Sequence, residues 1–125
     1  MTYNHTKEVS YSFQEALEKT KTALSNEGFG VISEIDLKEK FKEKLNIEFR
    51  EYRILGACNP KIAHQAIQLE DKIGVLLPCN ILVQEHPNGK VEVSAINPME
   101  TMAAVDNPDL EVIAADISQR LKSVI

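Results

Sequence analysis

Recurring helix-start signals divide this sequence into short segments and limit the folds it can adopt. Ser12 and Glu15 have the spacing of a capping box, and so do Asp36 and Glu39. An Asn-Pro step, with asparagine as N-cap and proline at the first helical position, occurs at 59–60, 97–98 and 107–108. The signals alternate with β-prone segments, so the sequence predicts helices interleaved with strands.

The β-prone segments predict the strands. They are expected within 3–10 and at 29–35, 47–58, 73–85 and 90–96. The long segment 73–85 is expected to bend at Pro78, because proline cannot donate a hydrogen bond to a sheet. His86-Pro87-Asn88-Gly89 predicts a hairpin between the last two strands.

Apolar side chains at helical spacing predict which helix faces are buried. In the first helix, which Gly28 is expected to end, these are Phe13, Leu17, Thr20 and Leu24. Leu37, Phe41 and Leu45 form a stripe in the second helix, Ala63, Ala66 and Ile67 point inward in the third, and Ile113, Ile117, Leu121 and Val124 form the stripe of the last. The order βαβαβαββαα predicts one domain over 1–125, an α+β sandwich in which helices pack on a mixed sheet of about five strands.

Charge and hydropathy exclude several classes of function. The formal net charge of −5 repels phosphate backbones, so we expect no nucleic-acid partner. The longest apolar stretch, 73–83, is too short and too interrupted to span a bilayer, and the first residues have no apolar core of a signal peptide. We therefore expect a soluble cytoplasmic protein whose two cysteines are reduced thiols.

Three segments carry a family resemblance. Ser33-Glu34-Ile35-Asp36, Tyr52-Arg53-Ile54-Leu55-Gly56-Ala57-Cys58-Asn59-Pro60 and Gly74-Val75-Leu76-Leu77-Pro78-Cys79-Asn80 resemble the signature of the domain-of-unknown-function family numbered 302 of bacteria and archaea. The resemblance extends over nearly the whole chain. It implies a compact α/β fold that tends to form homodimers, and it implies no activity, substrate or catalytic residue.

Cys58 and Cys79 are the candidate reactive residues. A helix of about a dozen residues connects their strands, which is the length that a parallel crossover needs. If the strands are parallel neighbours, both thiols lie at one carboxyl edge, beside the start of the helix at Pro60, where anions bind. The predicted ligand-binding residues at this edge are Cys58, Asn59, Pro60, His64, Pro78, Cys79 and Asn80.

The two cysteines allow three interpretations. They are small core residues, or a reactive thiol pair with Cys58 as nucleophile, or soft metal ligands together with His64. Two thiols and one histidine are too few for a closed zinc site, so we predict no metal and no cofactor. Asn97-Pro98 offers another helix start. In a simple sheet it is expected at the edge opposite Cys58, and only a sharp bend near Pro78 would bring both into one pocket.

Three functions follow from these features. The first is a non-enzymatic homodimer that binds a small anionic metabolite near Asn59 and Pro60. The alternative is a thiol-dependent redox sensor or enzyme that uses Cys58 and Cys79. The third is an interaction module that uses the charged helix 38–44, whose simplest interpretation is a solvated helix face.

Overall fold

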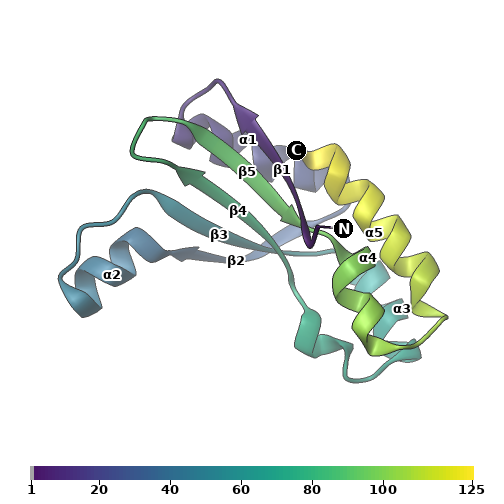
Figure 1. Cartoon of the computed structure of the whole chain (residues 1–125). Helices are drawn as coiled ribbons and strands as arrows, with labels where there is room; N and C mark the ends of the chain where they lie inside the picture. Colours follow the sequence, from purple (N-terminus) through teal and green to yellow (C-terminus); the bar gives the residue numbers. More distant parts are fainter. Residues whose placement is uncertain (1) are drawn as a thin grey trace.

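The computed structural model, which describes residues 2–125, contains one five-stranded sheet with helices packed against it (Figure 1). Its strands are β1 (Asn4–Val9), β2 (Gly30–Asp36), β3 (Tyr52–Cys58), β4 (Cys79–Glu85) and β5 (Val91–Ile96). The helices are α1 (Phe13–Asn26), α2 (Leu37–Leu45), α3 (Pro60–Leu69), α4 (Pro98–Thr101) and α5 (Leu110–Val124), with 3₁₀ segments η1 (Ile73–Leu76) and η2 (Met102–Val105). The predicted α+β class and element order are confirmed.

The sheet has the strand order β1-β5-β4-β3-β2, and every neighbouring pair is antiparallel. The prediction of a mixed sheet was therefore wrong, and the condition of parallel strands under which the two thiols were expected together does not hold. The apolar segment 73–77 does not extend β4, because it forms η1 and a turn that leads into the cis peptide bond between Leu77 and Pro78. After α3, the chain thus re-enters the sheet at the edge where β3 ended.

This return brings the strand ends together. Ala57 pairs with Cys79, and Gly30 pairs with Cys58, at one edge of the sheet. Because β5 runs antiparallel to β4, it ends at the same edge, and Asn97 follows it there. The expectation for a simple sheet, that Asn97 lies at the edge opposite Cys58, was wrong, because the chain turns at 73–78 and brings both residues to one end of the sheet.

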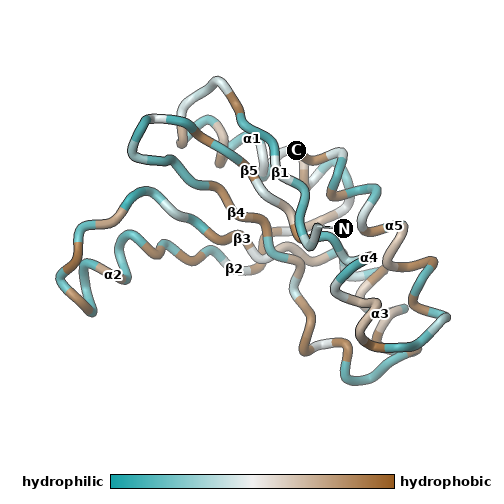
Figure 2. Tube along the Cα trace, viewed as in Figure 1, coloured by the Kyte–Doolittle hydropathy of each residue, from teal (hydrophilic) through white to brown (hydrophobic). Residues whose placement is uncertain are grey.

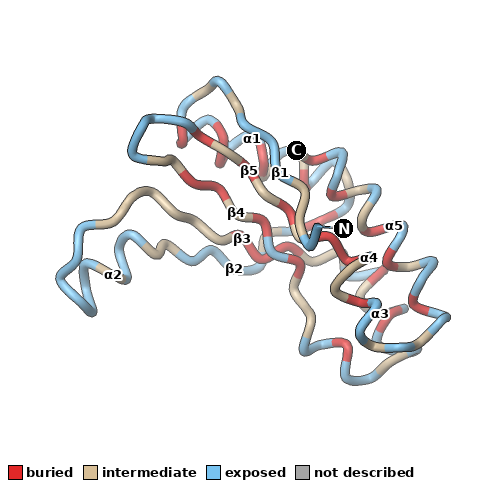
Figure 3. Tube along the Cα trace, in the orientation of Figure 1, coloured by how far each residue is buried: buried red, intermediate tan, exposed pale blue. Residues whose placement is uncertain are grey.

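The hydrophobic core lies between the sheet and the helix layer formed by α1, α3 and α5 (Figure 3). Alternate residues of the central strands point into it, as expected for a sheet with one covered face. The core side chains include Leu55, Ala57, Ile81, Val83, Val91, Val93 and Ala95 from the sheet, and Phe13, Leu17, Leu24, Ile62, Ala114, Ile117 and Leu121 from the helices. In α3, Ile62 and Ala66 are buried, whereas Ile67, which was predicted to point inward, is 42% exposed.

The predicted N-caps are confirmed except at 107–108, because α5 begins only at Leu110, with Asp109 as its N-cap and no side-chain bond. Ser12 Oγ accepts from the Glu15 amide at 3.1 Å, and Asp36 Oδ1 accepts from the Glu39 amide at 3.0 Å. Gly28 follows α1 with φ +85°, and its amide and the next one bond back to carbonyls of the last turn. Glycine adopts this left-handed conformation without steric cost, so it ends α1 sharply.

Helix α2 differs from the other long helices. It lies apart from them beyond the ends of β2 and β3 (Figures 1 and 2), and none of its residues is buried (Figure 3). Leu45 is 60% exposed, so the apolar stripe predicted for this helix has little of the chain to pack on. No helix within residues 2–125 is long and apolar enough to cross a membrane.

Candidate functional site

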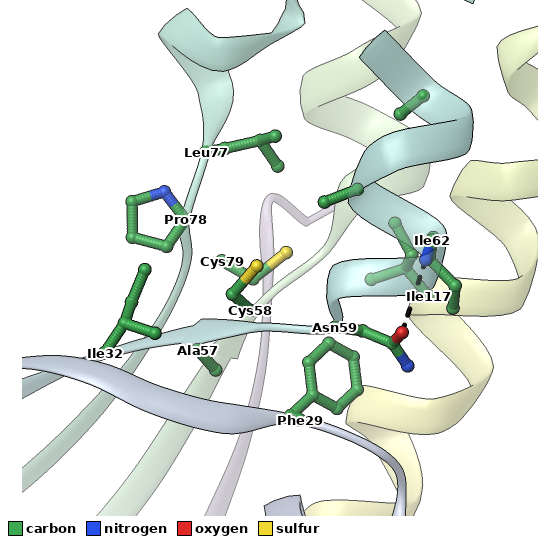
Figure 4. A pocket seen from close by; sticks show the side chains of 12 residues that line it. Phe29, Ile32, Ala57, Cys58, Asn59, Ile62, Leu77, Pro78, Cys79 and Ile117 are labelled. Carbon is green, nitrogen blue, oxygen red and sulfur yellow. Dashed lines mark hydrogen bonds between the residues drawn. The ribbon is translucent and has the colours of Figure 1, made fainter. Parts of the chain in front are cut away.

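A small apolar pocket opens at the sheet edge where β3 ends and β4 begins (Figure 4). Its volume is about 220 Å³. The sheet forms one wall, α3 forms another, and α5 contributes Ile117. The lining residues are Phe29, Ile32, Ala57, Cys58, Asn59, Ile62, Ala63, Ala66, Leu77, Pro78, Cys79 and Ile117.

Both cysteines line this pocket, and their sulfur atoms point into the same space (Figure 4). Cys79 starts β4 and is only 4% exposed, whereas Cys58 ends β3 and is half-buried. Burial, with a smaller contribution from nearby Cys58, raises the pKa of the Cys79 thiol to about 11. Cys79 is therefore a neutral thiol at neutral pH.

Asn59 joins the pocket to the start of α3. Its side-chain Oδ1 accepts from the Ile62 amide at 3.3 Å, and its carbonyl oxygen accepts from the Ala63 amide at 2.8 Å. Two of the amides at this helix start are thus already paired within the chain. The predicted N-cap role of Asn59 is confirmed, and its amide oxygen is not free to bind a ligand.

The sequence-predicted residues are only partly brought together. Cys58, Asn59, Pro78 and Cys79 line the pocket. Pro60 and His64 lie exposed on α3 outside the lining. Asn80 follows Cys79 on the strand and points to the opposite face of the sheet, where it is exposed.

Most apolar lining residues were not predicted as site residues. Phe29 follows the end of α1, and Ile32 lies at the irregularity in β2 where the register to β3 shifts between Val31 and Ser33. Ile117 was predicted as part of the inner stripe of α5, which was a signal for the core but not for a pocket. Only tertiary packing shows that these residues surround one cavity.

Gly56 allows the segment before β4 to approach β3 closely. A Cβ atom at this position would lie 2.9 Å from Cγ of Pro78 and would also collide with the Ser33 hydroxyl. Such distances are closer than carbon atoms normally approach, so glycine is required here. The close approach holds Pro78 against the sheet and fixes the adjoining wall of the pocket.

A cluster of charged side chains lies away from the pocket, on the outermost strand β2 and its neighbour β3. Arg53 binds Glu34 at 2.7 Å and Asp36 at 3.1 Å, and Lys21 of α1 binds Glu34 at 2.9 Å. The guanidinium of Arg53 also lies over the ring of Phe13, 5.7 Å from its centroid. This network ties α1 to β2 and β3, and it neutralises the two carboxylates.

The pocket offers little chemistry besides its thiols. Its walls are hydrocarbon apart from Cys58, Cys79 and Asn59. Across residues 2–125, no three His, Cys, Asp or Glu side chains gather as a potential metal-ligand set. The arrangement can enclose a small apolar molecule, and it presents two sulfur atoms to whatever occupies the pocket.

Comparisons with known proteins find a family model and a solved structure that are similar to this chain. The family model described as domain of unknown function DUF302 matches residues 5–125. A crystal structure of an uncharacterized conserved protein DUF302 from Bacillus stearothermophilus is similar, with a TM-score of 0.93 and 31% sequence identity. The similarity covers 99% of this chain and 96% of the other. No curated protein matches significantly.

Proposed function

This chain belongs to the family of domain of unknown function DUF302, whose description assigns no activity, and we propose that its own pocket binds a small, uncharged, largely apolar molecule without catalysis. The observation that carries this proposal is the hydrocarbon lining at the edge of the sheet. Ligand pockets in proteins are typically apolar with a few polar groups that orient the ligand. Here the two thiols are those groups.

The size of the pocket supports a ligand of one or two rings. A cavity of about 150 Å³ accommodates benzene, and drug-sized ligands occupy pockets of about 300–1,000 Å³. The present volume of about 220 Å³ lies between these sizes. A monocyclic or small bicyclic aromatic compound fits that range.

The lining supports an uncharged ligand better than the anionic metabolite expected from the sequence. An anion at the start of α3 needs free backbone amides, and those of Ile62 and Ala63 donate to Asn59. The pocket walls contain no lysine, arginine or histidine. The transfer of a charged ligand from water into such a site is unfavourable, whereas the transfer of an uncharged aromatic ring is favourable.

The test is to fill the pocket from one wall. Ala63→Leu adds a larger side chain to the lining of α3, whereas Gln65→Leu adds the same side chain on the exposed side of that helix. We expect phenol, indole or naphthalene to raise the melting temperature of the wild type and of Gln65→Leu in proportion to the logarithm of concentration. Ala63→Leu should lose this response.

Two outcomes would reject the binding function. One is the absence of any thermal shift in the wild type up to the solubility limit of these compounds. The other is an equal shift in Ala63→Leu, which would place binding elsewhere. Benzoate serves as the anionic comparison, and stronger stabilisation by benzoate than by phenol would restore the anionic ligand.

We also propose that the protein acts as a homodimer. The helices cover one face of the sheet, and the other face carries partly exposed apolar residues such as Ile35, Ile54 and Leu82. Next to that face lies α2, with four lysines and two glutamates in a chain of net charge −5. A second copy offers both an apolar face and an acidic surface, which complement this region.

A thiol-dependent function remains the alternative, and the placement of both cysteines in one pocket favours it. In such a sensor, a peroxide would accept two electrons from Cys58 and Cys79. The thiols would lose two protons and form one disulfide, and the peroxide would be reduced to water. The high pKa of Cys79 supports this function less well, because the thiolate is the reacting species.

A further inference from the structure

We propose that the sulfur atoms of Cys58 and Cys79 form a two-coordinate site for a soft monovalent cation, with Cu(I) as the ion of that class found in cells. This site shares both thiols with the pocket proposed above for an apolar ligand, but the observations that support it do not depend on that ligand. It follows from how the two thiols are placed and from the number of ligands they offer.

The fold brings two sulfur ligands together on a rigid frame. Cys79 starts β4 and pairs with Ala57 of the neighbouring β3. Cys58 follows Ala57 directly and ends β3. Both sulfur atoms point into the pocket that the two residues line together (Figure 4). Half-buried Cys58 gives an ion a way in, and Cys79, which is 4% exposed, holds it away from water.

The set of ligands selects the class of ion. Within the described residues, 2–125, no third His, Cys, Asp or Glu side chain completes the pair. Structural zinc requires four ligands, and calcium or magnesium requires oxygen. The side-chain oxygen in the pocket belongs to Asn59, and it already accepts the Ile62 amide. Thiolates prefer Cu(I), which is stable with two sulfur ligands in a line.

The charge of the complex is a cost at this position, and the metal–sulfur bonds offset it. A neutral thiol pair that binds Cu(I) releases two protons, and the resulting bis-thiolate complex has a charge of −1. The lining contains no lysine, arginine or histidine to balance this charge, so the site depends on the strength of the two copper–sulfur bonds. Apolar walls keep water from competing for the cation. The raised pKa of Cys79 makes loss of its proton costly, and the copper–sulfur bond offsets that cost.

The experiment is an anaerobic titration of the fully reduced protein with Cu(I) in the presence of a chromophoric Cu(I) chelator. We expect one tightly held ion per chain. Cys58→Ser and Cys79→Ser should each lower the affinity by more than about 100-fold, since even changes to groups that only orient metal ligands cost about 10- to 100-fold. His64→Ala, an exposed imidazole on the same helix, is the matched control and should bind as the wild type does.

Two further measurements keep the result decisive if a cysteine variant folds poorly. X-ray absorption of the loaded wild type should show two sulfur atoms and no nitrogen around copper. Ag(I), a redox-inert ion of the same preference, should raise the melting temperature of the wild type, and Zn(II) should not. A third ligand, a Zn(II) response larger than that to Ag(I), or unchanged affinity in Cys58→Ser would each overturn the proposal.

The outcome is separable from that of the apolar ligand. Copper binding is measured with the metal alone, and ligand binding is measured with uncharged aromatics in metal-free protein. Failure of the titration would reject the metal site and leave the aromatic thermal shifts as they are. If the aromatic compounds cause no thermal shift, the copper stoichiometry is likewise unaffected.

Discussion

At the scale of single residues, the two cysteines of the pocket differ although they lie at the same end of neighbouring strands. Cys79 is inside the core at the start of β4, where the loss of water destabilises its thiolate and raises its pKa to about 11. Cys58 is half-buried at the mouth of the pocket. The chain therefore places one protected thiol and one accessible thiol within the same cavity.

This difference predicts unequal alkylation. In native protein at pH 8, iodoacetamide should label Cys58 much faster than Cys79, because only the exposed thiol meets the reagent and the thiolate is the nucleophile. Mass spectrometry of the digested protein measures the two rates separately. After unfolding in urea both rates should become equal. Equal rates in the native protein would show that Cys79 is not protected as the structure indicates.

The Arg53 network predicts a dependence of stability on pH. Hydrogen bonds from Lys21 and then Arg53 lower the pKa of Glu34 in the folded chain. Its contribution to stability is therefore present above its ordinary pKa of about 4.3, and it is lost as pH falls through the lower folded value. Glu34→Gln should reduce the free energy of unfolding at pH 7 by up to about 1 kcal/mol, because the pair is partly solvated.

Urea denaturation between pH 3 and pH 7 checks this expectation. The wild type should lose more stability than Glu34→Gln as the solution is acidified. Glu43→Gln, on the exposed face of α2, is the control for loss of a carboxylate outside the network. Parallel curves for the wild type and Glu34→Gln would mean that the network does not act through Glu34.

At the scale of elements, the sequence predicted what local chemistry decides. Residues at helix ends act within one turn of the helix, so a short stretch of sequence was enough to predict them. This holds for the N-cap residues Ser12, Asp36 and Asn59 and for Gly28 after α1. The start of β4 was predicted too early, because the apolar run at 73–77 is as compatible with a strand as with the 3₁₀ segment that it forms. Its 3₁₀ conformation depends on packing, which buries Ile73 and leaves Val75 86% exposed.

The same limit applies to the candidate site. The sequence pointed to Cys58, Asn59, Pro78 and Cys79, which do line one pocket. It reached them through a parallel crossover that does not exist, since β3 and β4 are antiparallel. The apolar walls were missed, because a side chain that lines a cavity and one that fills the core follow the same periodic pattern.

Asn97 connects three elements at the sheet edge, and its loss should be costly. Its Oδ1 accepts from the Met99 amide at 3.2 Å and from Ser118 Oγ at 3.1 Å, and its Nδ2 donates to the Thr2 carbonyl at 3.2 Å. It is 6% exposed, so Asn97→Ala leaves partners without water. We expect a loss of about 1–3 kcal/mol in the free energy of unfolding.

Asn107→Ala is the matched comparison. Asn107 is more exposed, and its Oδ1 accepts from the Asp109 amide at 3.1 Å while its Nδ2 donates to the Leu69 carbonyl at 2.9 Å, so its removal should cost about 0.5–1 kcal/mol. Chemical denaturation of both variants under the same conditions gives the difference. A cost for Asn97→Ala no greater than that for Asn107→Ala would show that the buried network contributes nothing beyond an ordinary cap.

At the scale of the whole molecule, the helix layer and the uncovered face lie on opposite sides of the sheet, and the two proposals concern different sides. α1, α3 and α5 enclose the core and the pocket on one side of the sheet. The opposite face and α2 contribute no wall to that pocket, so they are available for assembly. A contact on this side would leave the mouth of the pocket open to a ligand or an ion, which makes binding and dimer formation compatible.

The dimer proposal predicts which substitutions separate the copies. A stable interface usually buries about 1,200–2,000 Å² in total, and a charge placed in its apolar part is strongly unfavourable. Ile35 on the uncovered face is 42% exposed and Leu45 on α2 is 60% exposed. We expect Ile35→Glu and Leu45→Glu to sediment as single chains of 14.0 kDa, and the wild type should sediment at twice that mass.

Val112→Glu tests the specificity of the effect, since Val112 is 78% exposed on α5, in the helix layer. It should remain dimeric, because that surface lies outside the proposed interface. A monomeric wild type would reject the dimer, and dissociation by Val112→Glu alone would move the interface to the helix layer and make the exposed stripe of α2 an ordinary solvated surface.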